Sequence, residues 1–345
     1  PALISCCADP MTEADFVPSA AVVGVSAAFS VVLIFILRPL LVRHLMAHPN
    51  ERSSHIKATP EGAGFGVMVA IFAVCGALLV WKLVPEPNLV PILLGAAALT
   101  VLGGLDDARP LPVTWRLVAQ VVVALGIVLT LPPDFGVLPT VLPAGAERAL
   151  LVFGMVCFVN VINFMDGLDW MTVAQVVPMA LGVAILWGLD IVPPGIGFLA
   201  LALLGAMLGF AVFNKHPASI FLGDSGSLPI GLILAYMLIW VAEAHFVSAL
   251  LLALYTIADS ALTFIRRLRD GEKVTAAHKT HYYQRAVANG FRVPEVTTRI
   301  FLLCCWLAIL AIVAALAASL TADAAALALG IAGVAFVLSS FARGR

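Results

Sequence analysis

Residues 196–242 read IGFLALALLGAMLGFAVFNKHPASIFLGDSGSLPIGLILAYMLIWVA, and this stretch decides the fold. Two apolar runs, 196–213 and 227–242, enclose a short polar link. A bilayer core needs about 20 apolar residues in a helix, and only helices or closed barrels satisfy the backbone there. Because both runs are continuous rather than alternating, they predict two transmembrane helices joined by a polar loop.

The same pattern recurs along the whole chain. Its 345 residues are 62% hydrophobic and 11% charged, whereas soluble domains carry roughly 25% charged residues. We therefore expect an all-α polytopic membrane protein, residues 1–345 forming one domain with about eleven transmembrane helices. The expected spans lie near 20–37, 64–84, 89–104, 117–132, 148–164, 171–188, 196–213, 227–242, 246–265, 297–318 and 323–341.

The basic residues predict an orientation. With these spans, and with Arg299 at the start of 297–318 counted with the loop before it, the odd-numbered loops and the C-terminal tail hold all of the 19 Lys and Arg residues except Lys82 and Arg148. Cytoplasmic loops carry the excess of positive charge, so the N-terminus is expected outside and the C-terminus in the cytoplasm. No basic stripe with interleaved aromatic residues occurs, so no nucleic-acid partner is expected.

Polar side chains gather in the loops expected to be cytoplasmic. GGLDDARPLP (103–112) carries Asp106 and Asp107, which would point about 100° apart on a helix and serve different partners. The alternative is a solvated helix end. NVINFMDGLDW (160–170) carries two Asn and two Asp residues, and the members of each pair are three positions apart, so that they would lie on one face of a helix. The alternative is that these residues only cap the end of a span. These four residues are Asn160, Asn163, Asp166 and Asp169.

The later loops add further candidates. NKHPASIFLGDSGS (214–227) contains Asn214 and places Asp224 among small residues before a helix, whose N-terminus attracts anions. A capped turn is the alternative. The last loop sets His278 and His281 among cations that include Arg285, which suits phosphate oxygens better than zinc. Contact with anionic lipid head groups is the alternative there.

Two further positions complete the candidates. The first loop supplies Arg52 and Lys57. Asp259 is expected inside the membrane, where it pairs with a neighbouring span.

Together these groups predict phosphoryl transfer at a lipid–water boundary. Carboxylate oxygens suit Mg²⁺, with Mn²⁺ as a substitute, and Mg²⁺ commonly binds substrate phosphates. Cations compensate the charge of a phosphoryl transition state. The rival class is a multispan transporter of an anionic solute, whose polar groups should lie at the bilayer midplane.

The chain resembles the polyprenyl-phosphate N-acetylhexosamine-1-phosphate transferases, the superfamily that also makes the first lipid intermediate of peptidoglycan. The resemblance covers residues 48–292 and rests on five motifs in order. These are PNERSSHIKATPEGAG, GGLDDARPLP, NVINFMDGLDW, FNKHPASIFLGDSGS and AHKTHYYQR.

The resemblance implies that a polyprenyl phosphate attacks a UDP-sugar and releases UMP. It implies metal ligation by Asp224 and Asp107. The implied catalytic residues are Asp106, Asp107, Asp166, His278 and His281. The implied substrate-binding residues are Arg52, Lys57, Asn160, Asn163, Asp169, Asn214 and Arg285.

Two departures from the family pattern are Trp170 after DGLD and Glu61 in the first motif. The HxxH spacing and the Arg-rich last loop resemble the O-antigen and common-antigen initiating branch, which implies a UDP-N-acetylhexosamine donor. We accordingly expect a bacterial inner-membrane enzyme with a cytoplasmic site that initiates cell-envelope polysaccharide synthesis. The resemblance also implies a homodimer.

Overall fold

A computed structural model of the chain describes residues 13–47, 58–84, 89–138, 141–272 and 279–344. The elements are α1 (Glu13–His44), β1 (Met46–Ala47), β2 (Thr59–Pro60), α2 (Gly64–Val80), α3 (Leu89–Ala108), α4 (Val113–Leu129), α5 (Ala144–Phe164), α6 (Met171–Gly188), α7 (Pro194–Asn214), α8 (Asp224–Ala244), α9 (Phe246–Arg269), α10 (Tyr282–Ala288), α11 (Val293–Ala317) and α12 (Leu320–Arg343).

The all-α polytopic fold is confirmed. Within the described residues, nine helices are long and apolar enough to cross a membrane, and α2 and α4 are shorter apolar helices. These eleven helices correspond one by one to the predicted spans. The sequence did not predict α10, a helix of seven residues inside the last polar loop.

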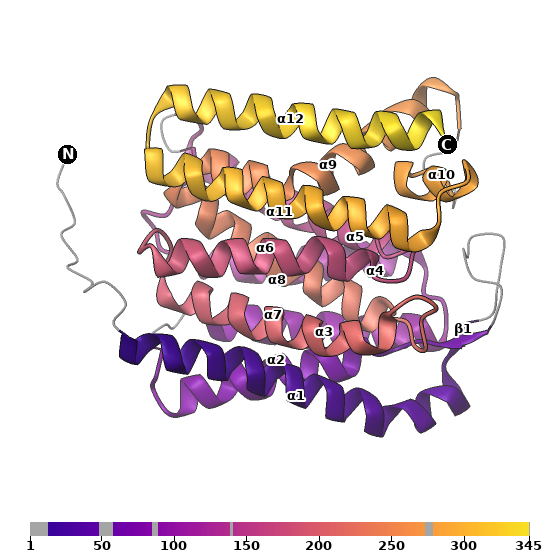
Figure 1. Cartoon of the computed structure of the whole chain (residues 1–345). Helices are drawn as coiled ribbons and strands as arrows, with labels where there is room; N and C mark the ends of the chain where they lie inside the picture. Colours follow the sequence, from indigo (N-terminus) through magenta and orange to yellow (C-terminus); the bar gives the residue numbers. More distant parts are fainter. Residues whose placement is uncertain (1–12, 48–57, 85–88, 139–140, 273–278, 345) are drawn as a thin grey trace.

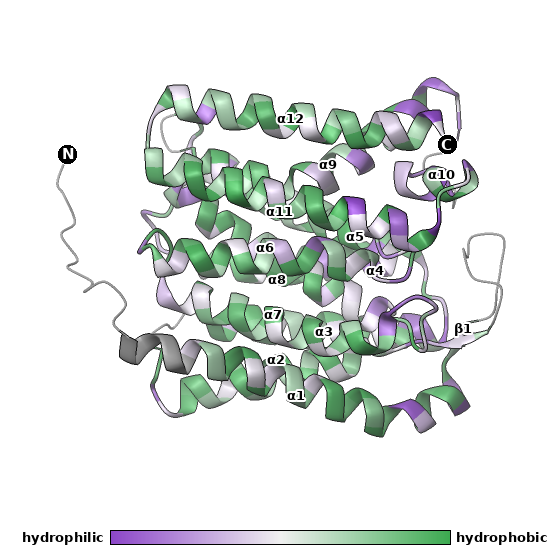
Figure 2. Ribbon diagram, in the orientation of Figure 1, coloured by the Kyte–Doolittle hydropathy of each residue, from purple (hydrophilic) through white to green (hydrophobic). Residues whose placement is uncertain are grey.

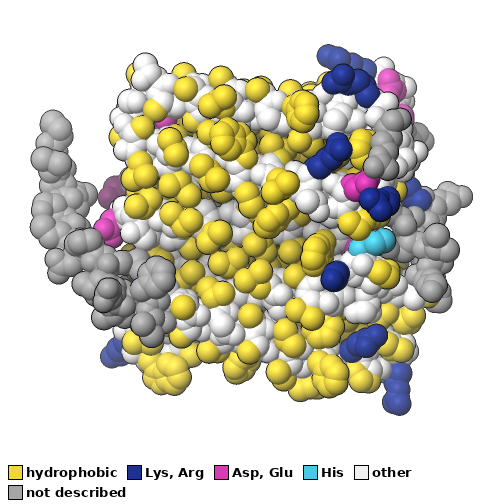
Figure 3. Space-filling view, in the orientation of Figure 1, with side chains coloured by type: hydrophobic (Ala, Val, Ile, Leu, Met, Phe, Trp, Pro, Cys, Tyr) yellow, Lys and Arg dark blue, Asp and Glu magenta, His cyan; other side chains and the backbone are white. Residues whose placement is uncertain are grey.

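The long helices run side by side and alternate in direction (Figure 1). We call the end where α1, α3, α5, α7 and α9 finish the polar end. Figure 2 shows hydrophilic residues gathered there, and Figure 3 shows apolar side chains over much of the visible face between the two ends. Phe35 and Phe336 remain 68% and 72% exposed, as expected for side chains that face lipid.

Hydroxyl groups join α1 to α7 inside this apolar bundle. Ser26 and Ser30 are fully buried, and their hydroxyls donate to main-chain carbonyls of α7 at 2.6 and 2.8 Å. Small and hydroxylated residues are the usual contacts between membrane helices, because they let the backbones approach. The first span is thereby part of the bundle.

At the polar end, three helix termini meet at backbone distance. A Cβ atom on Gly64 would lie 2.1 Å from the amide nitrogen of Gly226, and one on Gly103 would lie 2.1 Å from the carbonyl oxygen of Asp224. The amide of Gly64 also donates to the carbonyl of Leu222 at 2.9 Å. The start of α2, the end of α3 and the start of α8 therefore form one junction.

Two charged residues at the opposite end fold the Pro-rich loop before α5 onto the bundle. Glu147 is buried and accepts from the amides of Val137 and Leu138 at 2.5 and 2.6 Å. Arg148 donates to the carbonyl of Val128 at 2.7 Å. These side chains therefore have structural roles.

The junction predicts that Gly64→Ala destabilises the protein. The new methyl group would meet backbone that cannot move aside, and overpacking of this kind costs about 1–3 kcal/mol. Gly76→Ala, in the same helix, is the matched control because a Cβ atom there meets nothing within 4 Å. Thermal unfolding in detergent should show a lower midpoint for Gly64→Ala alone, and equal midpoints for the two variants would contradict the junction.

Candidate active site

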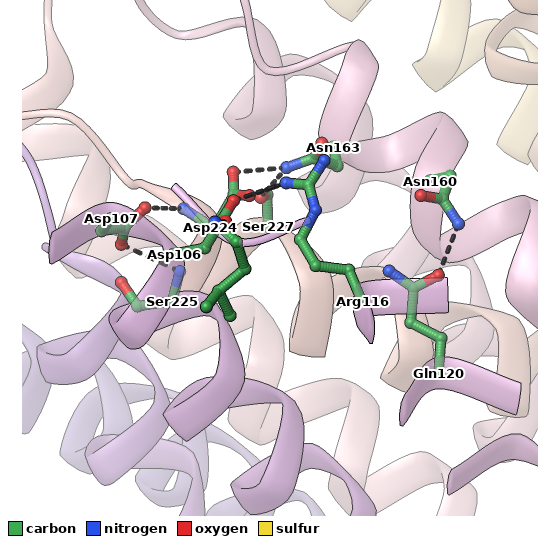
Figure 4. A network of polar contacts seen from close by, with 10 residues as sticks. Asp106, Asp107, Arg116, Gln120, Asn160, Asn163, Asp224, Ser225 and Ser227 are labelled. Atoms are coloured by element: carbon green, nitrogen blue, oxygen red, sulfur yellow. Dashed lines mark hydrogen bonds and ion pairs between the residues drawn. The ribbon is translucent and has the colours of Figure 1, made fainter. Parts of the chain in front are cut away.

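The Asp107 carboxylate joins the end of α3 to the start of α8 (Figure 4). Its Oδ1 accepts from the amide of Asp224 at 2.7 Å, and its Oδ2 accepts from the amide of Ser225 at 3.1 Å. The first amides of a helix have no partner within that helix, and a negative charge there is stabilised by the helix dipole. Gly223 has a φ of 76°, and a Cβ there would lie 2.5 Å from Asp107 Oδ2.

Arg116, in the first turn of α4, bridges two acids from different helices. Its Nη1 atom lies 2.5 Å from Asp106 Oδ2 and 3.0 Å from Asp224 Oδ2. The other oxygen of Asp106 accepts from the amide of Leu111 at 2.6 Å. One guanidinium therefore holds the α3 and α8 carboxylates against each other, partly exposed at the polar end (Figure 4).

Arg116 is a site residue that was not predicted from the sequence. The sequence did contain an indication, because Arg116 follows Asp106 after the Pro-Leu-Pro segment 110–112 and directly precedes the apolar span 117–132. An arginine placed that close to two acids at a span end is a natural ion-pair partner.

Asn163 completes the cluster from α5. Its amide group donates to Asp224 Oδ1 at 2.7 Å and to the hydroxyl of Ser227 at 2.8 Å. Both oxygens of Asp224 thus have neighbours, Asn163 on one side and Arg116 on the other. We call Asp106, Asp107, Arg116, Asn163 and Asp224 the acidic cluster.

Asn160 lies one helical turn away and has different contacts. Its amide donates to Gln120 Oε1 at 2.6 Å and to the carbonyl of Val156 at 2.8 Å. Gln120 is buried on α4. The Asn160–Gln120 pair therefore joins α4 to α5 beneath the acidic cluster, and the predicted contact of Asn160 with substrate stays a prediction.

Asp166 lies in the loop between α5 and α6, where the hydroxyl of Thr172 donates to it. Burial raises the pKa of Asp166 from 3.8 to about 7, the hydrogen bond from Thr172 opposes the rise, and the negative charges of Asp107 and Asp169 add to it. Asp166 follows Asn163 of the acidic cluster by three residues and lies directly after the end of α5, at the polar end.

Asp169 and Asn214 connect two loops of the polar end. Asp169 Oδ2 lies 2.6 Å from His216 Nδ1 and accepts from the amide of Ala218 at 3.0 Å. Asn214 Oδ1 accepts from the amide of Trp170 at 2.7 Å. Both side chains are buried, so the structure gives them contacts within the protein, and substrate binding by either stays a prediction.

His216 is a second residue of this region that was not predicted from the sequence. Its side chain is 44% exposed, although a buried carboxylate holds one ring nitrogen. The residue lies within the quoted NKHPASIFLGDSGS motif, and that position was the available signal.

The last loop is described only in part. His281 is buried and lies 3.2 Å from Asp259, and the Arg285 guanidinium lies 5.7 Å from the Tyr282 ring centre. These contacts lie within the α9–α10 region. The predicted residues Arg52, Lys57 and His278 lie outside the described residues.

The donor set of the acidic cluster suits Mg²⁺. Among the described residues, no group of three or more His, Cys, Asp or Glu side chains could hold a metal ion. Mg²⁺ usually needs only one or two carboxylates, with waters and substrate phosphates completing its shell. The carboxylates of Asp106 and Asp224 already contact one positively charged group, the Nη1 atom of Arg116. Ligation by Asp224 and by Asp107 both stay predictions, and both oxygens of Asp107 already accept amide protons.

Comparisons with known proteins show what this chain is similar to. Residues 89–242, from α3 to α8, match the family described as glycosyl transferase family 4. The chain is 29% identical over 280 residues, 76% of each chain, to a Bacillus subtilis protein named probable undecaprenyl-phosphate N-acetylglucosaminyl 1-phosphate transferase.

Relatives with other names match as well. A Mycobacterium leprae protein named decaprenyl-phosphate N-acetylglucosaminephosphotransferase is 28% identical, covering 86% of this chain and 83% of its own. A Deinococcus radiodurans protein named phospho-N-acetylmuramoyl-pentapeptide-transferase is 31% identical, covering 52% of this chain and 61% of its own.

Glu61 gives the site a pH dependence. It follows β2 and is half-buried; burial raises its pKa from 4.5 to about 7, and the charges of Asp107 and Asp106 add to the rise. Between these pH values the folded protein keeps a proton that the unfolded chain releases, so the free energy of unfolding falls as the pH rises. In metal-free buffer, the thermal unfolding midpoint of Glu61→Gln should therefore fall less steeply with rising pH than that of the wild type.

Asp270→Asn, which removes an exposed carboxylate at the same end of the bundle, is the matched control. The same slope in the wild type and in Glu61→Gln would contradict the assignment.

Proposed function

We propose, from the premise that this chain belongs to the superfamily of polyprenyl-phosphate sugar-phosphate transferases, that its donor is a UDP-N-acetylhexosamine. In the proposed reaction, the phosphate of a polyprenyl phosphate attacks the β-phosphorus of the donor. The bond between the α- and β-phosphates breaks, and the products are UMP and a polyprenyl-diphospho-sugar. The observation that carries the proposal is the bridge from Arg116 to Asp106 and Asp224 at the polar end.

The arrangement of the cluster supports this chemistry. Phosphoryl transfer depends on positioning and on compensation of charge. Arg116 supplies a positive charge that two carboxylates hold in place, and arginine is well suited to bind phosphate oxygens. Asp224, together with Asp106 or Asp107, would hold Mg²⁺, which would supply further positive charge to the diphosphate of the donor.

The contacts of Asp107 support an orienting role for the acidic pair. Its two oxygens accept from two backbone amides, which is an arrangement for an ionised carboxylate that fixes α8. The nucleophile needs little help, because a phosphate monoester has its second pKa near 6 and is mostly a dianion at neutral pH. Asp106 and Asp107 therefore orient phosphate and metal, and neither acts as an obligatory base.

The place of the cluster fits a lipid substrate better than transport. Its residues lie at the ends of α3 and α5 and at the starts of α4 and α8, where a polyprenyl chain can stay in the bilayer while its phosphate reaches water. Transporter sites lie near the bilayer midplane on broken helices. The excess of Lys and Arg at the polar end supports a cytoplasmic position for this end in a bacterial inner membrane.

The branch within the superfamily is a finer proposal. The Arg-rich last loop supports a role in initiating a cell-envelope polysaccharide of the O-antigen or common-antigen kind. The relatives carry names from other cell-envelope pathways, N-acetylglucosaminyl and N-acetylmuramoyl-pentapeptide transfer. A panel of donors distinguishes these alternatives, and a homodimer is compatible with each of them.

Purified protein incubated with polyprenyl phosphate, Mg²⁺ and a panel of UDP-sugars should release UMP from a UDP-N-acetylhexosamine. Asp224→Asn should lower kcat about 100-fold or more, because it removes the negative charge that holds Arg116 and that would hold Mg²⁺ against the reacting phosphates. Asp323→Asn, at the far end of the bundle beside His245, is the matched control and should keep full activity. Release from no donor, or equal activity in both variants, would refute the proposal.

The proposed sidedness can be tested with single cysteines in a chain whose native cysteines are replaced. Lys215 is exposed at the polar end and Ser319 is exposed at the opposite end. A membrane-impermeant maleimide should label Ser319→Cys in intact cells, and should label Lys215→Cys only after the membrane is opened. The reverse pattern would place the acidic cluster outside the cell.

A further inference from the structure

Asp259 is a buried carboxylate in the middle of an apolar membrane helix. It is 0% exposed on α9, and two of its neighbours belong to the same helix, the hydroxyls of Tyr255 and Thr263 at 3.3 Å each. A charged group at this depth is costly and usually has a function. The contacts within α9 do not account for this carboxylate, because an apolar side chain at the same position would be less costly to bury.

The other partners of Asp259 come from the start of α10. Its Oδ1 accepts from the amide of Tyr282 at 2.9 Å and lies 3.2 Å from His281 Nδ1. Its Oδ2 accepts from the amide of Tyr283 at 3.2 Å. The tautomer of His281 that carries a proton on Nδ1 donates it to this carboxylate oxygen. One side chain thus fixes both the beginning of α10 and the orientation of the His281 ring.

Tyr283 carries this attachment onward to the loop that holds Asp166. The Tyr283 side chain is fully buried, and its hydroxyl donates to the carbonyl of Phe164 at 3.0 Å. A Cβ atom on Gly167 would lie 2.2 Å from the same hydroxyl. The loop between α5 and α6 therefore rests directly on α10, and α10 rests on Asp259.

We propose that Asp259 is a positioning residue for the reaction, acting on His281 directly and on the Asp166 loop through Tyr283. This inference rests on the proposed function. Asp259 touches neither substrate; it determines where two parts of the site stand relative to the acidic cluster. The final loop, which is far from Asp166 in sequence, is thereby coupled to the α5–α6 loop through a single buried charge.

Three variants test the proposal in the purified full-length protein. Asp259→Asn keeps the shape but loses the charge and one acceptor, and kcat for UMP release should fall about 10-fold or more, since small misplacement of reacting groups is costly. KM for the UDP-sugar should change less than kcat. Tyr283→Phe should lower kcat in the same direction by a smaller factor, and the double variant should be no slower than Asp259→Asn alone.

Tyr255→Phe is the matched control, because it also removes one buried phenol hydroxyl that contacts Asp259 but leaves α10 attached. It should keep the wild-type kcat. Wild-type kcat in Asp259→Asn, or an equal loss in Tyr255→Phe and Tyr283→Phe, would overturn the proposal. If Asp259→Asn does not fold, the Tyr283→Phe and Tyr255→Phe pair decides by itself.

Hydrogen–deuterium exchange gives a readout that needs no substrate. Asp259→Asn, or Tyr283→Phe if the former does not fold, should speed exchange in peptides covering residues 164–171, whereas Tyr255→Phe should not. Unchanged exchange there would overturn the proposal even if the enzyme is active. If the wild type releases UMP from no donor, the proposed function fails while the exchange result still decides the role of Asp259.

Discussion

The structure depends on the hydrogen bonds from the first amides of α8 to the Asp107 carboxylate at the end of α3. These bonds form because glycines let the backbones of α2, α3 and α8 approach to contact distance. They place Asp224, the first residue of α8, beside Asp106, the neighbour of Asp107 on α3. Arg116 can then reach both acids from α4, and Asn163 can reach Asp224 from α5. Without the attachment of α8 to α3, these groups would have no common meeting point.

The bilayer explains why the acids of the cluster and Asp259 have partners within the protein. A membrane bundle has no water in its core to solvate a charge, so each acid near a helix end must find a partner within the protein. The acidic cluster does so with one arginine, one asparagine and backbone amides, and Asp259 does so with the start of α10. Because these partners come from separate helices, the polar contacts that neutralise charge also fix how the helices stand at the polar end. Stability and site geometry therefore share the same bonds.

The sequence predicted the spans well, because a long and continuous apolar run crosses lipid as an α-helix. It also predicted that Asp106, Asp107, Asn163, Asp166 and Asp224 would converge, since helix ends on one side of a bundle must lie near one another. It could not predict partners. The contact between Arg116 and Asp224 joins residues 108 positions apart, and no periodicity reports such a pair. Likewise, Asp169 and Asn214 are polar residues of two separate motifs in the sequence, but their buried contacts with each other's loops are visible only in three dimensions.

The central claim is that acids from separate helices meet around a divalent cation at the lipid–water boundary. The most direct measurement is a structure of the protein with Mn²⁺ and a UDP-sugar, in which anomalous scattering locates the ion. The account predicts an ion bound by the carboxylate of Asp224 and by Asp106 or Asp107, in contact with the diphosphate of the donor. An ion bound elsewhere, with none of these three carboxylates among its ligands, would contradict the account.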